Sequence, residues 1–159
     1  MASRLRKKQI IPEDTPIRAT LTDPKIVHGN FGRQVELMTN VTEGGENNEY
    51  KGTTFKTWFS FGKDKETKEE YIAYGGPLYQ LLSMVAPNLD EVLEDLPERE
   101  YQKFLKKAVR ELDDFKIIAR VGVKDKNDKK SNFLQYGTYG PDDEGADFND
   151  LDMGDESAA

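Results

Sequence analysis

The sequence contains no cysteine, one histidine and one tryptophan, and each scarcity narrows what this chain can do. Without cysteine, the 159 residues hold no disulfide, no thiolate metal ligand and no cysteine nucleophile. No apolar run approaches the roughly 20 residues of a membrane-spanning helix, and the first residues lack the apolar segment of a signal peptide. We therefore expect one main domain in the cytoplasm.

Motifs for enzyme chemistry are also missing. The single histidine, His28, stands beside Gly29, and neither HExxH nor EF-hand spacing is present. No glycine-rich phosphate loop and no GxSxG nucleophile motif occurs. Because nothing joins a nucleophile to a base, we expect a protein that is not an enzyme, with no catalytic residue, no metal and no cofactor.

Charge is unevenly distributed along the chain. The formal net charge is −7, yet all 23 lysines and arginines lie in residues 1–140, together with 22 of the 30 acidic residues. The other 8 acidic residues follow Gly140. The body of the protein is thus close to neutral, and the acidic total charge does not argue against an anionic partner such as nucleic acid.

Composition divides the chain into three parts. Residues 1–14 read as a basic N-terminal arm, residues 15–140 as a folded domain, and residues 141–159 as an acidic tail that we expect to be disordered. The tail contains no cation but includes Phe148, Leu151 and Met153. A purely solubilising tail does not need apolar residues, so partner binding is one interpretation and simple solubilisation is the other.

The hydrophobic periodicity predicts a mainly β protein with a helical insertion. Strands are expected at 15–23, 33–42, 55–62, 115–124 and 131–140, with a turn at Asp23–Pro24. Helices are expected at 77–86, 88–96 and 97–112, between the third and fourth strands. This is the order of the OB-fold, a five-stranded Greek-key barrel. A ferredoxin-like fold fits less well, because it needs a helix directly after its first strand.

The segment FKTWFSFG, residues 55–62, suggests where function lies. Alternation places Phe55, Phe59 and Phe61 inside, and it leaves Trp58 and Lys56 on the outer face. Applied to the other strands, the same rule gives an outward-facing set of nucleic-acid-binding candidates: Arg18, Lys56, Trp58, Lys116, Arg120 and Lys124, with Tyr136 as a further stacking platform. Cations neutralise phosphates and aromatic rings stack on unpaired bases. The alternative is a Trp58 partly buried in the barrel wall beside a merely solvated lysine.

In organisation, a basic-faced OB domain followed by an acidic tail with embedded apolar residues resembles bacterial and phage single-stranded DNA-binding proteins. The resemblance implies sequence-independent binding of single-stranded DNA during replication or recombination, in a bacterium or a phage-infected cell. It also implies that the tail competes with DNA for the domain's own groove and recruits replication or recombination proteins through Asp147, Phe148, Asp150, Leu151 and Asp152. Because the chain ends in GDESAA, without the Ile-Pro-Phe of bacterial tails, a phage-type relative is favoured.

Two other functions stay open. A protein-interaction adaptor would use the helical insertion around residues 100–109 as its contact surface, and its binding would be insensitive to Trp58 and to salt. An RNA-binding OB-fold protein is the third reading, because stacking and phosphate contacts do not separate RNA from DNA without a reader of the 2′-hydroxyl.

Overall fold

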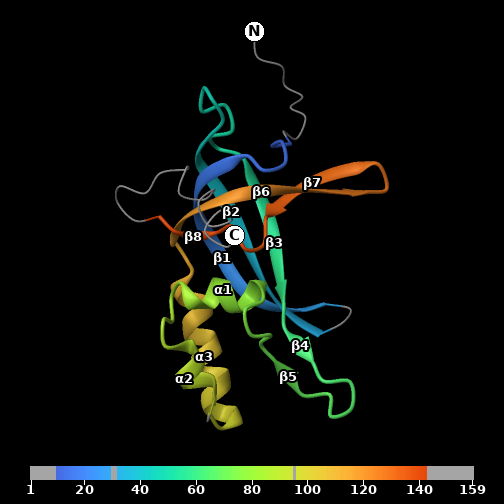
Figure 1. Cartoon of the computed structure of the whole chain (residues 1–159), viewed down its shortest axis with the longest axis vertical. Helices are drawn as coiled ribbons and strands as arrows, with labels where there is room; N and C mark the ends of the chain where they lie inside the picture. Colours follow the sequence, from blue (N-terminus) through green and yellow to red (C-terminus); the bar gives the residue numbers. More distant parts are fainter. Residues whose placement is uncertain (1–9, 30–31, 95, 143–159) are drawn as a thin grey trace, which may run out of the picture.

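The computed structural model describes residues 10–29, 32–94 and 96–142, and Figure 1 shows their arrangement. Most of the basic arm and most of the acidic tail lie outside the described residues. The proposed partner-binding residues in the tail lie there too, namely Asp147, Phe148, Asp150, Leu151 and Asp152.

The predicted mainly β architecture is confirmed. The main sheet consists of six strands: β1 (Pro16–Gly29), β2 (Gly32–Gly44), β3 (Thr54–Ser60), β6 (Lys116–Lys126), β7 (Lys129–Leu134) and β8 (Gly140–Pro141). Their order is β3-β2-β1-β6-β7, with β8 paired to β6, and every pairing is antiparallel. A separate two-stranded sheet pairs β4 (Gly62–Lys63) with β5 (Glu70–Tyr71).

The predicted helical insertion is confirmed as well. It comprises α1 (Pro77–Ser83), α2 (Leu89–Glu94) and α3 (Glu98–Glu111), which gather at one end of the main sheet in Figure 1. Acidic side chains in the first turn of α3 and Arg110 in its last turn complement the helix dipole. No helix within the described ranges is long and apolar enough to span a membrane.

Alternation in the first three strands places the core where the sequence predicts it. The inward residues of β1 include Ile17, Ala19 and Leu21, and β2 and β3 alternate in the same way. Inward residues of these two strands are Val35, Leu37, Thr39, Val41, Phe55, Thr57 and Phe59. In β6 the alternation is interrupted, because Ile118 is buried together with both of its neighbours. Its ladder partners are Arg18 in β1 and Gly140 in β8.

The turn predicted at Asp23–Pro24 is wrong. β1 continues for 14 residues, and the pairing with β2 only shifts register between Thr22 and Lys25. Asp23 adopts a positive φ of 52°, and Pro24 has no N–H to donate to a ladder. Such an irregularity bends a strand without ending it, so β1 resumes pairing at Lys25, opposite Glu36.

The packed part of the chain begins before the predicted boundary at residue 15. Ile11 is fully buried in the core. Its N–H donates to Asn132 Oδ1 and its carbonyl accepts from Asn132 Nδ2, both at 2.9 Å. The N–H of Asp14 donates to the carbonyl of Val121 at 2.8 Å. Residues 10–14 show no hydrophobic periodicity, so the sequence gives no sign that they are packed. Their contacts with Val121 and Asn132 show that they are.

The backbone pairing does not close the sheet into the predicted five-stranded Greek-key barrel. The sheet has six strands, and among the described residues no backbone ladder joins β3 to β7. The two outer strands are instead linked through side chains. Thr57 Oγ1 accepts the Leu134 N–H at 3.0 Å, and the Tyr136 hydroxyl donates to the Trp58 carbonyl at 3.0 Å. The sheet is therefore open, with its two ends in contact.

Candidate functional site

The seam between β3 and the β6–β7 hairpin contains a groove of about 580 Å³, here called the β3–β7 groove. Four of the seven predicted nucleic-acid-binding residues line it: Lys56, Trp58, Lys124 and Tyr136. They come from three separate parts of the chain, and the contact between the two ends of the sheet brings them together.

Trp58 faces outward, as alternation predicts. Its side chain is 44% exposed, whereas its neighbours Thr57 and Phe59 are buried. Trp58 lies opposite Glu36 in the β2–β3 ladder, and its indole Nε1 donates to Glu36 Oε1 at 3.0 Å. The indole is therefore held in place by one edge while a large part of it stays accessible.

A second aromatic surface lies across the groove. Tyr136 is 47% exposed, and its ring centroid lies 5.7 Å from that of Phe133. Partial burial raises the pKa of the Tyr136 phenol, which keeps it a neutral donor to the Trp58 carbonyl. Phe133 packs against Gly122, where a Cβ would lie 2.4 Å from the ring. Glycine at this position therefore allows the Phe133 ring to lie close to β6.

Glu36 accepts the hydrogen bond of the Trp58 indole. Burial alone would raise its pKa, but hydrogen bonds from Lys25 and Trp58 and the charges of Lys56 and Lys25 outweigh burial and lower it. The carboxylate lies 3.2 Å from Lys25 Nζ. It is thus ionised at neutral pH, with two lysines close enough to offset its charge.

The accessible surface continues along β3 beyond the groove. A second hollow of about 490 Å³ shares Lys56, Trp58, Ser131 and Asn132 with the groove and extends to Met38 of β2. Lys56 and Trp58 line both hollows, so they lie where the two meet. The two hollows together form one extended depression that contains a lysine and an indole.

Arg18 is not part of this depression. Its Nε lies 3.1 Å from a Glu43 carboxylate oxygen, and its Nη1 lies 3.2 Å from Asp142 Oδ1. Arg18 does face outward, but it does so on β1, and its charge is engaged by these two acids. Arg18 therefore does not line the two hollows together with Trp58.

Lys116 and Arg120 also lie away from the groove. Residues 116–120 of β6 pair with β1, whereas residues 121–126 pair with β7. Lys124 belongs to the second stretch and reaches the groove, while the other two cations remain beside β1. Arg120 also donates from Nη1 to the carbonyl of Asp14 at 2.9 Å. The alternation of side chains along β6 shows which residues face outward, but it does not show that the neighbouring strand changes from β1 to β7 along its length.

The sequence reading missed the lysines at the end of the β6–β7 hairpin. Lys126 pairs with Lys129, and Asn127 and Asp128 have the two positive φ angles of a tight hairpin turn. Alternation puts Lys124, Lys126 and Lys129 on one face of the hairpin, which extends beyond the rest of the sheet in Figure 1. The signal in the sequence is the segment KDKNDKK, residues 124–130, which contains four lysines.

No group of three histidine or acidic side chains within the described residues is arranged to hold a metal ion. No known protein family matches the chain, and no curated protein is significantly similar to it in sequence.

Proposed function

We propose that this protein binds single-stranded DNA in the β3–β7 groove without preference for base sequence. The observation that carries the proposal is the composition of the groove. Trp58 and Tyr136, each nearly half exposed, line the groove together with Phe133, Lys56 and Lys124.

The chemistry of single strands matches this combination. Unpaired bases stack on aromatic side chains with about 1–3 kcal/mol per base, and every base offers a π face. Lysines neutralise backbone phosphates and release counterions, which makes binding weaken with salt. Lys126 and Lys129 would extend the phosphate contacts along the hairpin.

We further propose that the sheet is an OB-type barrel. Its strand order, the helical insertion before β6 and the two hydrogen bonds that link β3 to Leu134 of β7 and to Tyr136 just after it support this assignment. OB-folds bind oligonucleotides on the face of their second and third strands and on the loops beside it. Trp58 and Lys56 occupy the corresponding face on β3.

A role in replication or recombination follows from the resemblance to phage and bacterial single-stranded DNA-binding proteins. In this proposal the protein acts in the cytoplasm of a bacterium or an infected cell. The acidic tail recruits partner proteins and competes with DNA for the cationic groove.

Fluorescence of the single tryptophan tests the proposal directly, because Trp58 is the only indole in the chain. The full protein is titrated with oligo-dT, oligo-U and duplex DNA at two salt concentrations. We expect strong quenching by oligo-dT, weaker binding at higher salt and little quenching by duplex. Equal quenching by oligo-U would extend the function to RNA. Absence of quenching by both oligonucleotides would contradict the proposal.

One observation supports the alternative function as a protein-interaction adaptor. α3 exposes a row of cations at helical spacing, formed by Lys103, Lys106, Lys107 and Arg110, at the end of the molecule that carries the helices. A protein partner bound there would leave Trp58 fluorescence unchanged.

A further inference from the structure

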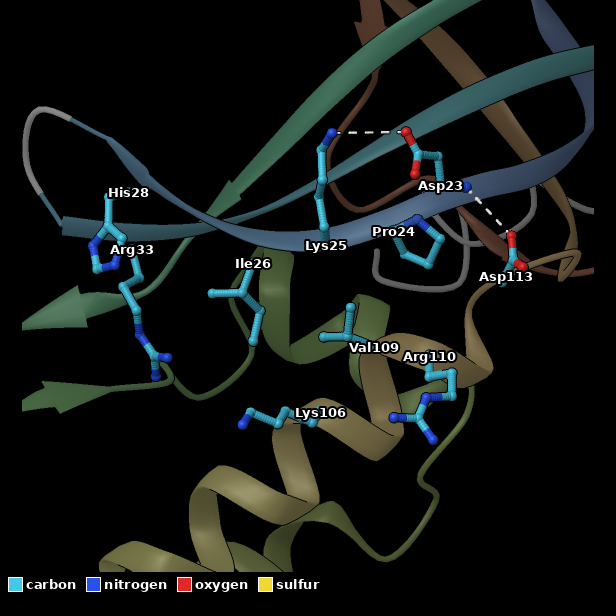
Figure 2. A pocket seen from close by; sticks show the side chains of 10 residues that line it. All are labelled: Asp23, Pro24, Lys25, Ile26, His28, Arg33, Lys106, Val109, Arg110 and Asp113. Carbon is cyan, nitrogen blue, oxygen red and sulfur yellow. Dashed lines mark hydrogen bonds and ion pairs between the residues drawn. The ribbon is translucent and has the colours of Figure 1, made fainter.

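A second cavity lies between α3 and the distal half of β1, and it has no part in the β3–β7 groove. Its volume is about 570 Å³, and Figure 2 shows the side chains that line it. Ile26 from β1 and Val109 from α3 point toward one another, and Pro24 adds to this apolar wall. Val109 is buried in the core at 4% exposure, whereas Ile26 and Pro24 are partly exposed. The irregularity at residues 23–24 of β1 forms one side of the cavity.

The cations of this cavity differ in what they contact. Lys25 pairs with Asp23 and Glu36, and the guanidinium of Arg33 is bonded to Glu70. Lys106 and Arg110, by contrast, make no ion pair within the described part of the chain. Both are exposed and project from α3 on either side of Val109 in Figure 2. The cavity therefore combines an apolar centre with two cations at its rim that have no ion-pair partner among the described residues.

The acidic tail leaves the described part of the chain close to this cavity. The N–H of Asp142 donates to the carbonyl of Lys116 at 3.0 Å. Lys116 is three residues from Asp113, which lines the cavity and accepts the N–H of Asp23. Three residues span at most about 11 Å, and the six residues from Asp142 to Phe148 span at most about 22 Å. The tail is thus long enough to enter the cavity.

The tail is complementary to the cavity in both charge and polarity. Residues 143–159 hold seven acidic side chains and no cation, and Phe148, Leu151 and Met153 interrupt the acids. An apolar side chain of the tail would fit beside Ile26 and Val109, and the carboxylates on either side of it would face Lys106 and Arg110.

We infer that the α3–β1 cavity is a docking site for the acidic C-terminal segment of the same chain. Phe148 or Leu151 packs against the partly exposed Ile26 and Pro24 beside Val109, and the neighbouring carboxylates bind Lys106 and Arg110. The site is separate from the groove, so this inference does not depend on DNA binding. A tail docked there does not occupy the groove, so in this inference only the undocked fraction of the tail competes with DNA.

A spin label in the tail locates the tail directly. Because the chain has no cysteine, Asn149→Cys gives the full-length protein one site for a nitroxide. Amide signals close to the label are lost from the NMR spectrum and return when the nitroxide is reduced. We expect this loss to be stronger at Ile26, Val109 and Arg110 than at Lys56, Trp58 or Lys124.

Two charge-reversal variants of the labelled protein sharpen the test. Lys106→Glu with Arg110→Glu should restore the cavity signals. Lys103→Glu with Lys107→Glu makes the same charge change on the same helix outside the cavity and should leave the signal loss intact. In 1 M salt, where the Debye length is about 3 Å, the cavity signals of the unreversed protein should recover in part.

The other outcomes overturn the inference. Signal loss that is stronger at the groove than at the cavity, or absent from the described residues, would show that the cavity does not hold the tail. A sample that mixes isotope-labelled protein without nitroxide and unlabelled protein with nitroxide reports only contacts between molecules. Loss of the cavity signals in that mixture would assign the occupant to a second copy. Equal effects of the two double variants would reduce the contact to unspecific charge attraction.

Discussion

The indole of Trp58 donates a hydrogen bond to the Glu36 carboxylate at 3.0 Å from the directly opposite position on the neighbouring strand. This contact orients an aromatic side chain that is nearly half exposed. Orientation before binding lowers the entropy that a ligand must otherwise compensate, which favours stacking at this site. The same contact places a negative charge beside the groove, and Lys25 and Lys56 offset it.

Replacement of the indole should weaken binding of single strands. Trp58→Ala removes one stacking platform, so we expect a loss of about 1–3 kcal/mol, which is about 5- to 160-fold in the dissociation constant for oligo-dT. The dissociation constant of Trp58→Phe should lie between those of Trp58→Ala and the unaltered protein. Fluorescence anisotropy of a labelled oligonucleotide measures both. Tyr74→Ala is the control, because Tyr74 is 82% exposed and does not line the groove. Unchanged affinity of Trp58→Ala would remove Trp58 from the site.

Lysines of the hairpin should govern the salt dependence of binding. For single strands, the slope of log affinity against log salt changes by about 0.7 for each phosphate contact. Lys124→Gln and Lys126→Gln should each reduce the slope by that amount, measured from titrations at several salt concentrations. Lys103→Gln on α3 is the matched control. A slope that changes equally in all three variants would mean that the hairpin makes no specific phosphate contact.

Stability should depend on the ionisation of Glu36 in acid. Its folded-state pKa lies below the ordinary 4.5, so the carboxylate is favoured by folding. The resulting stability is present above the unfolded-state pKa and is lost as pH falls through the lower folded-state value. Glu36→Gln should therefore flatten the loss of unfolding free energy below pH 4.5, measured by denaturant titration. An identical pH profile in the variant would argue against this assignment.

Asn132 should anchor the N-terminal segment. Asn132→Ala leaves the N–H and carbonyl of Ile11 and the carbonyl of Gly122 without this partner. We expect a loss of about 1–3 kcal/mol in unfolding free energy. Hydrogen exchange at the Ile11 amide should accelerate by more than this global loss explains. Asn40→Ala, which removes hydrogen bonds between β1 and β2, is a control that should leave the Ile11 amide relatively protected.

Removal of the tail should strengthen DNA binding at low salt. Gly140 and Pro141 pair with β6, and Asp142 binds Arg18, so truncation should begin after Asp142 to leave these contacts intact. The truncation removes seven acidic residues and no cation. The affinity for oligo-dT should rise most at low ionic strength, where the Debye length is longest. Equal affinities with and without the tail at low salt would contradict self-competition.

Much of the fold could be predicted because burial imposes a strict period. The alternation of Ile17, Ala19 and Leu21 against Arg18 determined which side of β1 faces the core. In the same way, the spacing of Leu105, Ala108 and Val109 determined the buried face of α3. Residues 10–14 and the continuation of β1 past Pro24 escaped prediction. Their positions depend on partners that are distant in sequence, such as Asn132 and Glu36.

Trp58 and Lys56 must share an outer face once residues 54–60 form a strand, because side chains alternate along any strand. Which other residues join them depends on how the strands assemble into the sheet. β6 changes its pairing partner from β1 to β7 along its length. Because of this change, Lys124 lines the groove with Trp58, whereas Lys116 and Arg120 lie beside β1. A site formed where the two ends of one sheet meet depends on how that sheet bends. The local period of a strand carries no information about that bending.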